Sequence, residues 1–267
     1  MRTSPKMSTA LNVIRNLSDA RLRPIMLQKI GRRLTRLLNE RERGAARWAA
    51  RHAGDHVALC RRIDGALWDE TVQYVSDFRR EAEAILARNP ALGGGGNYHL
   101  LYFLTRLLKP GVVLETGVAA GFSTHAVLTA LEKNGQGRLF SSDFPYFRLA
   151  HPERYVGILV PEALRHRWSL SLEGDSVSVP RFLASIPKVD LFHYDSDKTY
   201  GGRTQTIDLV LPRLSDRGVA LIDDIQDNYH FRDLVRRGRL NSQVFAFEGK
   251  YCGLLHDESA NPLREQA

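Results

Sequence analysis

Short apolar runs, separated by helical segments and turns, fill the chain from residue 112 onward and constrain its fold most. The first five runs are separated by stretches long enough for a helix, whereas only Glu248, Gly249 and Lys250 separate the last two. Alternating strand and helix predicts a parallel sheet covered on both faces, and a three-residue link permits a hairpin but no crossover. We therefore expect an α/β protein with a doubly wound, seven-stranded sheet that ends in an antiparallel hairpin. The expected strands are 112–116, 138–142, 168–172, 189–194, 218–222, 243–247 and 251–256.

The N-terminal part of the chain is basic and helical in pattern. Residues 1–60 hold thirteen Arg or Lys against four Asp or Glu, whereas the whole chain has a net charge of +8. The excess positive charge therefore lies in this segment. Met26, Ile30 and Leu34 recur at helical spacing among arginines, and a second helical stretch is expected over 64–88.

A run of glycines at 93–96 separates the two patterns and is the best domain boundary in the sequence. We expect a basic helical arm in residues 1–92 and a catalytic domain in residues 93–267. A basic amphipathic arm has three possible uses: a lid over the active site, an oligomer interface, or weak contact with an anionic membrane. We favour lid and interface, because apolar stripes on helices usually pack on protein.

Composition favours an ordinary cytoplasmic protein. No stretch approaches the ~20 apolar residues of a membrane-spanning helix, and no apolar run follows the basic N-terminus as in a secretory signal. Cys60 and Cys252 form neither a disulfide framework nor a metal-ligand spacing, which fits a reducing compartment.

The first expected strand runs into a glycine loop, E-T-G-V-A-A-G, and a helix is expected from about Ser123. Gly117 lets the chain turn out of the strand, and Gly121 lets the helix begin close to a ligand. A dinucleotide site would read G-x-G-x-x-G, whereas this loop has an acid, Glu115, inside the strand end. A nearby carboxylate suits the sulfonium and amino-acid end of S-adenosylmethionine (SAM). The alternative is a purely structural turn.

Two further acids follow the second and third expected strands. Asp143 is placed to accept hydrogen bonds from both ribose hydroxyls, and Asp175 is placed to bond the adenine amino group. Taken singly, Asp143 could be a turn residue and Asp175 a helix N-cap. Their order after the glycine loop favours a cofactor site.

From about Asn97 to His256 the chain resembles the class I SAM-dependent O-methyltransferases of the macrocin and novobiocin pathways, and more distantly catechol O-methyltransferase. The resemblance implies a Rossmann-like fold and a role in natural-product biosynthesis. The segments that carry it are L-E-T-G-V-A-A-G-F-S-T, S-S-D-F-P-Y, R-W-S-L-S-L-E-G-D-S, D-L-F-H-Y-D-S-D-K-T-Y and G-V-A-L-I-D-D-I. The cofactor contacts that it implies are Glu115, Gly117, Asp143 and Asp175, to which we add Gly121, Ser123 and Ser176.

The fourth and fifth expected strands end in carboxylates, Asp195 on one and Asp223 and Asp224 on the other. Neighbouring strand ends in a doubly wound sheet line the ligand crevice, and clustered carboxylates need a cation. All-oxygen ligands suit Mg2+ or Mn2+, and the resemblance implies a divalent metal at these positions. Alternatively, Asp224 caps the following turn, and Asp195 and Asp197 bound a surface loop.

The expected reaction is methyl transfer to a hydroxyl of a sugar, polyketide, phenol or lipid-linked acceptor, with the metal stabilising the deprotonated oxygen. Asp197 matches the second aspartate of the family's D-x-D motif and is the first choice of base. Lys198 is the second choice, and many relatives have His there. His193 lies within a strand and is expected to be a core histidine rather than a ligand.

Other functional classes are less consistent with these motifs. A metal-independent methyltransferase, in which the aspartates orient the acceptor, is the nearest alternative. The loop spacing argues against an NAD-dependent oxidoreductase, and we expect no Tyr-x-x-x-Lys pair of the kind that short-chain dehydrogenases use. The arm lacks interleaved aromatics and the chain lacks an N-P-P-Y-type motif, so no nucleic-acid partner is expected. A non-enzymatic membrane-surface protein would leave the acidic positions unexplained. We expect a homo-oligomer that acts on a small molecule.

Overall fold

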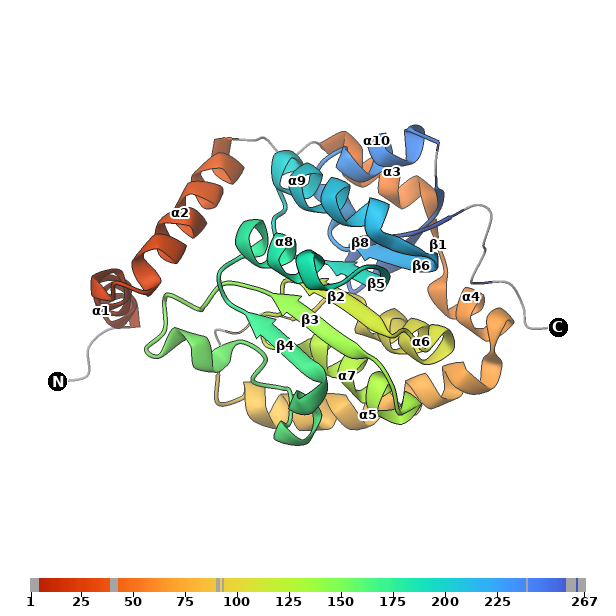
Figure 1. Ribbon diagram of the computed structural model, residues 1–267, viewed down its shortest axis with the longest axis horizontal. Helices are drawn as coiled ribbons and strands as arrows, with labels where there is room; N and C mark the ends of the chain where they lie inside the picture. Colours follow the sequence, from red (N-terminus) through yellow and green to blue (C-terminus); the bar gives the residue numbers. More distant parts are fainter. Residues whose placement is uncertain are drawn as a thin grey trace.

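The computed structural model describes residues 5–38, 43–89, 92, 94–238, 240–257 and 263. In this part of the chain the strands form one eight-stranded sheet in the order β1-β7-β8-β6-β5-β2-β3-β4 (Figure 1). The strands are β1 (Ala53–Gly54), β2 (Val112–Thr116), β3 (Arg138–Ser142), β4 (Trp168–Ser171), β5 (Val189–Tyr194), β6 (Leu214–Ile222), β7 (Asn241–Phe247) and β8 (Lys250–His256).

The doubly wound topology and the terminal hairpin predicted from the sequence are confirmed. Strands β2 to β6 pair in parallel, and β8 pairs antiparallel with both β6 and β7. Glu248 and Gly249 join the hairpin with positive φ angles of 47° and 79°, the conformation of a tight hairpin turn. Strand order reverses between β2 and β5, and the carboxyl ends of these strands are where such sheets bind ligands.

The sheet has one strand more than the seven expected. β1 lies in the segment assigned to the arm and pairs in parallel with β7, with Ala53 opposite Val244 and Gly54 opposite Phe245. Two residues carry no readable alternation, so this strand depends on tertiary pairing and not on a local pattern.

Helices cover both faces of the sheet. Leu191 and Leu221 point to the face packed by α4, α6 and α7, whereas Phe192 and Ile222 point to the face packed by α3, α8, α9 and α10. The α-helices are α1 (Pro5–Ser18), α2 (Leu22–Leu38), α3 (Arg43–His52), α4 (His56–Ile63), α5 (Gly65–Leu86), α6 (Tyr98–Leu108), α7 (Phe122–Asn134), α8 (Asp175–Ser185), α9 (Tyr200–Val210) and α10 (His230–Arg236). Short 3-10 turns are η1 (Pro152–Tyr155), η2 (Glu162–Arg167), η3 (Leu211–Arg213) and η4 (Ile225–Asp227).

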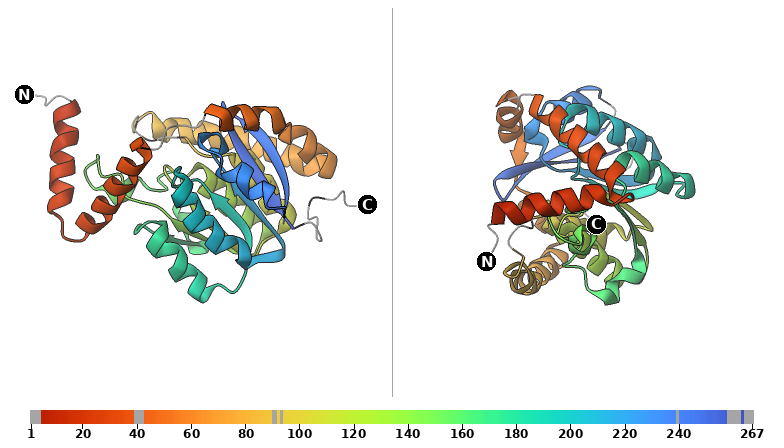
Figure 2. Two further views of the ribbon diagram at one scale, coloured as in Figure 1. Left: turned by 90° about the horizontal axis from the view of Figure 1, so that it is seen from above. Right: turned by 90° about the vertical axis from the view of Figure 1, so that its left-hand side faces the viewer.

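The N-terminal segment is divided differently from the expected arm. Ala49, Cys60 and Trp68, from α3, α4 and α5, are buried in the same cores as the sheet. Only α1 and α2 stand at one end of the molecule, apart from the other helices (Figure 2). The segment that behaves as an arm is therefore α1–α2, not the whole of residues 1–92. No described helix is long and apolar enough to cross a membrane.

Candidate active site

The loop between β2 and α7 has the backbone geometry expected of a ligand-binding turn. Gly117 and Gly121 have φ angles of 87° and 102°, a region that glycine enters at little cost. A Cβ on Gly117 would lie 2.5 Å from the main-chain oxygen of Asp195, and one on Gly121 would lie 2.9 Å from the Cα of Gly157. Both positions require glycine for packing as well as for conformation.

Asp143, directly after β3, braces this loop. Its carboxylate accepts hydrogen bonds from the main-chain N–H groups of Val118 at 2.9 Å and Ala119 at 2.7 Å, and from that of Phe144 at 2.6 Å. Burial raises the pKa of this carboxyl, although the hydrogen bond from Ala119 and the charge of Lys29 oppose the rise. Asp143 therefore fixes the shape of the glycine loop, and its contact with a ribose stays a prediction.

Asp175 is the first residue of α8 and is 2% exposed. Its carboxylate accepts a hydrogen bond from Ser196 Oγ at 2.6 Å and another from Ser142 Oγ. The N-cap of α8 is Gly174, so Asp175 does not play the capping role that was its structural alternative. It ties the end of β3 to the loop after β5, and its adenine contact stays a prediction.

Helix α2 lies over the strand ends that carry these two acids. Gln28 Nε2 donates to Ser176 Oγ, and Lys29 Nζ donates to the main-chain oxygen of Pro145 at 3.2 Å. A small apolar cluster joins the arm to the segment after β3 and contains Leu22, Met26, Phe144 and Phe147. Of the three expected uses of the arm, this placement supports a lid. The lid would cover the side of the sheet where the cofactor is predicted.

Glu115 lies in the interior, beneath the glycine loop. Its carboxylate accepts hydrogen bonds from Ser123 Oγ at 2.6 Å, Thr124 Oγ1 at 2.7 Å and Ser141 Oγ at 2.8 Å, and it lies 3.4 Å from Nδ1 of His193. Glu115 and Ser123 therefore hold α7 and β3 against β2, and their cofactor contacts stay predictions.

The region around the glycine loop fits SAM on its own chemistry. The ends of β2, β3 and β4 are adjacent, and each carries a residue suited to one part of the ligand. Thr116 Oγ1 is buried and finds no hydrogen-bond partner among the described residues, a state that a bound polar ligand would relieve. The carboxylates of Asp143 and Asp175 could accept from ribose and adenine.

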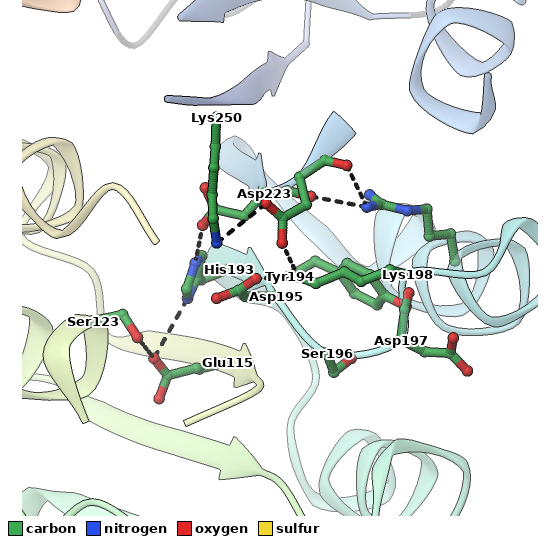
Figure 3. A network of polar contacts seen from close by, with 12 residues as sticks. Glu115, Ser123, His193, Tyr194, Asp195, Ser196, Asp197, Lys198, Asp223 and Lys250 are labelled. Carbon is green, nitrogen blue, oxygen red and sulfur yellow. Dashed lines mark hydrogen bonds and ion pairs between the residues drawn. The ribbon is translucent and has the colours of Figure 1, made fainter. Parts of the chain in front are cut away.

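His193 on β5 is fully buried, as expected of a core histidine, but its imidazole is bonded to two acids. Nε2 lies 2.6 Å from Oδ2 of Asp223, and Nδ1 lies 3.4 Å from Oε1 of Glu115 (Figure 3). Burial lowers the pKa of the imidazole, but the hydrogen bonds and charges of these acids outweigh burial and raise it to about 10. His193 is thus part of the acidic cluster, a role that the expectation of a simple core residue missed.

Lys198 bridges the ends of β5 and β6. Its ammonium contacts Oδ1 of Asp195 and lies 3.1 Å from Oδ2 of Asp224. Burial opposes the charge, but these two carboxylates raise the pKa of Lys198 above its ordinary value. A lysine held protonated in this way is unsuited to the second-choice role of general base.

The two acids bonded to Lys198 differ in their surroundings. Burial raises the pKa of Asp195 to about 6, although the charge of Lys198 opposes it. Burial also acts against ionisation of Asp224, but the charges of Lys198 and Lys250 outweigh it and lower the pKa to about 2. Lys250 Nζ lies 3.4 Å from Asp224 Oδ1.

Asp197 lies apart from this cluster. Its carboxylate accepts a hydrogen bond from the main-chain N–H of Thr199 at 2.9 Å, and it points away from His193 and Asp195 in Figure 3. The sequence placed Asp197 first as the base, but nothing in this arrangement directs it toward the strand ends. Its catalytic role stays a prediction.

Tyr194 and Lys198 have the Tyr-x-x-x-Lys spacing found in short-chain dehydrogenases, so the expectation that the sequence holds no such pair was wrong. Tyr194 ends β5 and its hydroxyl donates to the main-chain oxygen of Asp197 at 2.7 Å. The Lys198 ammonium is engaged by Asp195 and Asp224. The spacing therefore does not produce a dehydrogenase-type pair here.

The predicted magnesium site differs from the arrangement found. The side chains whose ligand atoms lie within 4.8 Å of one another are His193, Asp195 and Asp223, not the three aspartates. Mg2+ prefers oxygen ligands in octahedral geometry, and this group offers a nitrogen. Lys198 also occupies the space between Asp195 and Asp224. The residues as they lie do not fit the expected all-oxygen site.

Arg203 on α9 is a further residue that the sequence did not single out. It is fully buried, and its Nη2 donates to the main-chain oxygens of Asp223 at 3.0 Å and Asp224 at 2.9 Å. Asp224 has a φ angle of 53°, so Arg203 holds a strained turn that aims two acids into the site. No short motif identifies such an arginine.

A cavity of about 140 Å3 opens beside Asp223, between Gly94–Gly96 and the β7–β8 hairpin. A Cβ on Gly96 would lie 1.9 Å from Asp223 Oδ2 and 3.0 Å from His193 Nε2, so Gly96 lies directly over the cluster. The lining of this cavity includes Phe247, Tyr251 and Lys250. A larger cavity, about 810 Å3, lies elsewhere, at the β7 edge near Trp48, Arg62 and Arg236. Position, not size, makes the smaller one the candidate acceptor site.

Comparison with known proteins agrees with this geometry. Residues 114–225 match a family model described as a methyltransferase domain. The segment runs from the end of β2 to the turn after β6, so it contains the glycine loop and the acidic cluster. A search of curated protein sequences finds no match.

Solved structures with the same fold share little sequence with this chain. An O-methyltransferase from Bacillus cereus in complex with S-adenosylhomocysteine (SAH) is 16% identical, with a TM-score of 0.51, covering 72% of this chain and 91% of that one. TomG, an O-methyltransferase from Streptomyces achromogenes involved in tomaymycin synthesis, was solved with SAM. TomG is 15% identical to this chain, with a TM-score of 0.51, and the match covers 67% of this chain and 88% of TomG. The SAH-bound methyltransferase PaMTH1 from Podospora anserina is 15% identical, with a TM-score of 0.51, and the match covers 71% of this chain and 96% of PaMTH1.

These comparisons confirm the family resemblance and the enzyme class expected from the sequence. Residues 114–225 match a methyltransferase domain, and the chain has the fold of solved SAM- and SAH-bound O-methyltransferases.

Proposed function

We propose that this protein transfers the methyl group of SAM to a hydroxyl group of a small molecule. The observation that carries the proposal is the position of the two sets of strand-end residues. Asp143 and Asp175 follow β3 and β4, and Asp195 and Asp223 follow β5 and β6, on either side of the point where strand order reverses. A donor on one side and an acceptor on the other would meet at this switch point.

SAM supplies the methyl group: the hydroxyl oxygen forms a bond to the methyl carbon while the carbon–sulfur bond breaks and leaves its electron pair on sulfur. The protein must hold the acceptor in line and take its proton. Asp195 suits the second task. It ends β5, its side chain is 17% exposed, and a pKa of about 6 leaves it ionised yet basic near neutral pH.

The positions of the two predicted bases support Asp195 over both. Asp197 points away from the cluster (Figure 3), and Lys198 is held protonated between two carboxylates. We retain Asp197 as the alternative base, because substrate binding could reorient a loop residue of this kind. The proposed reaction uses no metal, because the residues as they lie do not fit the expected all-oxygen site.

The acceptor is proposed to present a small or narrow hydroxyl-bearing end. A cavity of about 140 Å3 beside Asp223 is well below the usual size of a drug-sized ligand site. Phe247 and Tyr251 could pack on a sugar or phenol ring, and Glu248 and Lys250 could bond its polar groups. A place in natural-product biosynthesis, a cytoplasmic location and a homo-oligomeric state remain parts of this proposal.

Mass-spectrometric screening of methyl acceptors tests the proposal. Purified protein, SAM and a panel of sugars, phenols and polyketides should yield SAH together with a singly methylated product on oxygen. Asp195→Asn should lose product while still binding SAH by calorimetry. A product methylated on nitrogen or carbon would contradict the proposal. So would a panel that gives no methylated product with SAM but a reduced product when NADH is supplied.

A further inference from the structure

We propose that the ammonium of Lys198 does the work expected of a divalent metal in this protein, so that methyl transfer needs no metal ion. The inference rests on the proposed function and deepens it, because it specifies how the same site handles negative charge. It departs from the metal that the family resemblance implies at Asp195, Asp223 and Asp224.

The position of Lys198 is the first support. Its Nζ contacts Asp195 and lies 3.1 Å from Asp224, so it joins two of the three carboxylates expected to bind metal. The side chain is only 10% exposed, which leaves little room for it to leave the site. A dication between the same two carboxylates would meet this ammonium at short range, where like charges repel strongly.

The third carboxylate is also engaged. Asp223 lies 2.6 Å from Nε2 of His193, and the two side chains are 9% and 0% exposed. Both ring nitrogens of His193 face carboxylates, Nε2 at Asp223 and Nδ1 at Glu115, so both are engaged as donors and neither offers a lone pair to a metal. Each of the three predicted ligands therefore has a cationic partner from the protein itself.

Charge balance removes the reason for a metal. Three carboxylates in one crevice need a cation, which is why the sequence favoured Mg2+. Three side chains supply that charge: His193 at Asp223, Lys198 at Asp195 and Asp224, and Lys250 at Asp224. Arg203 adds a fourth positive group on the main-chain oxygens of the same turn.

The ammonium can also serve the reaction. A lysine ammonium has three N–H donors, and the two carboxylates on Lys198 leave one for an acceptor oxygen. That donor would stabilise negative charge as the hydroxyl proton moves to Asp195, the neighbouring base. When the new carbon–oxygen bond has formed, Asp195 carries the proton and Lys198 is unchanged.

Metal binding by the full-length protein tests the inference without knowledge of the acceptor. Mn2+ titrated into the wild type and followed by electron paramagnetic resonance should remain free. Lys198→Met removes the ammonium and frees Asp195 and Asp224, so this variant should bind about one Mn2+. Lys250→Met is the matched control: it also removes a cation from Asp224, but one that is 55% exposed. Among the described residues Lys250 pairs with no second carboxylate, so this variant should gain no Mn2+ site.

The Mn2+ titration of the wild type tests the inference even if Lys198→Met fails to fold. Stoichiometric Mn2+ binding by the wild type, or a folded Lys198→Met that gains no site, would overturn the inference. With the acceptor from the screen, turnover should be unchanged in EDTA. Activity abolished by EDTA and restored by Mg2+ would overturn the inference but leave methyl transfer intact. If the wild type in the same samples does not bind SAH, the proposed function is overturned instead.

Discussion

His193 on β5 and Asp223 at the end of β6 are joined across neighbouring strands by a 2.6 Å contact between Nε2 and Oδ2, in the interior of the protein. The main-chain N–H of Asp223 also donates to Tyr194, the residue after the histidine, at 2.9 Å. The pair therefore belongs to the sheet and holds the carboxyl end of β6 in register with β5.

This pair predicts a pH-dependent contribution to stability. The pKa of His193 is raised from 6.5 to about 10 in the folded state, so the stabilisation is complete below pH 6.5 and is lost as pH rises toward 10. His193→Gln should lower the free energy of unfolding by a few kcal/mol near neutral pH, and the difference from the wild type should shrink at alkaline pH. Urea unfolding across this range measures it. His166→Gln, at an exposed site, should show no such trend, and a constant difference for His193→Gln would refute the assignment.

Asp143 should control cofactor affinity through the shape of the glycine loop. Asp143→Asn turns an amide N–H toward main-chain donors that the carboxylate now satisfies, at a cost of about 1–3 kcal/mol. We expect SAH affinity to fall about tenfold or more by calorimetry. Asp190→Asn is the matched control, because Asp190 also accepts from two main-chain groups, Gly111 and Val112, at the opposite ends of the strands. Equal loss of SAH affinity in both variants would mean a general effect on the sheet.

Gly96 should be essential for acceptor binding. An added Cβ would collide with Asp223 and crowd His193, so Gly96→Ala should abolish methyl transfer at a stability cost of about 1–3 kcal/mol. SAH binding should persist, because the cofactor is expected at other strand ends. Gly94→Ala is the control, since nothing lies within 4 Å of its added Cβ. Turnover measured with the screened acceptor separates the two, and normal turnover in Gly96→Ala would show that the acceptor lies elsewhere.

Removal of residues 1–42 should affect the cofactor side of the site. This cut removes α1 and α2 but keeps α3, whose Ala49 is part of the core. Without Gln28 and Lys29 over Ser176 and Pro145, SAH should dissociate faster in stopped-flow measurements. Light scattering on the same protein tests the predicted homo-oligomer, and anionic liposomes test the weaker membrane expectation. An unchanged dissociation rate would show that the arm is no lid for the cofactor.

Sequence reasoning recovered the sheet because its strands are buried runs with clear ends. β2, β3 and β5 begin and end where expected, and the short link at Glu248 fixed the antiparallel hairpin. It failed at β1, where two residues carry no pattern, and at β6, whose first residues, from Leu214 onward, precede the apolar run.

The order of the candidate residues along the sheet could be predicted from the sequence, but the hydrogen bonds and ion pairs among them could not. The glycine loop and the strand-end acids depend on local order, so their places could be predicted. The partners of His193 and Lys198 could not, because Glu115, Asp223 and Asp224 come from other strands. A magnesium site and an ion-paired lysine have the same acids in sequence, and only tertiary structure distinguishes them.

Calorimetric titration of SAH and NAD+ into the full-length wild-type protein tests the central claim, that the glycine loop and strand-end acids form a SAM site, most directly. We predict saturable binding of SAH at one site per chain and no heat from NAD+. Binding of NAD+ with none of SAH or SAM would contradict the account.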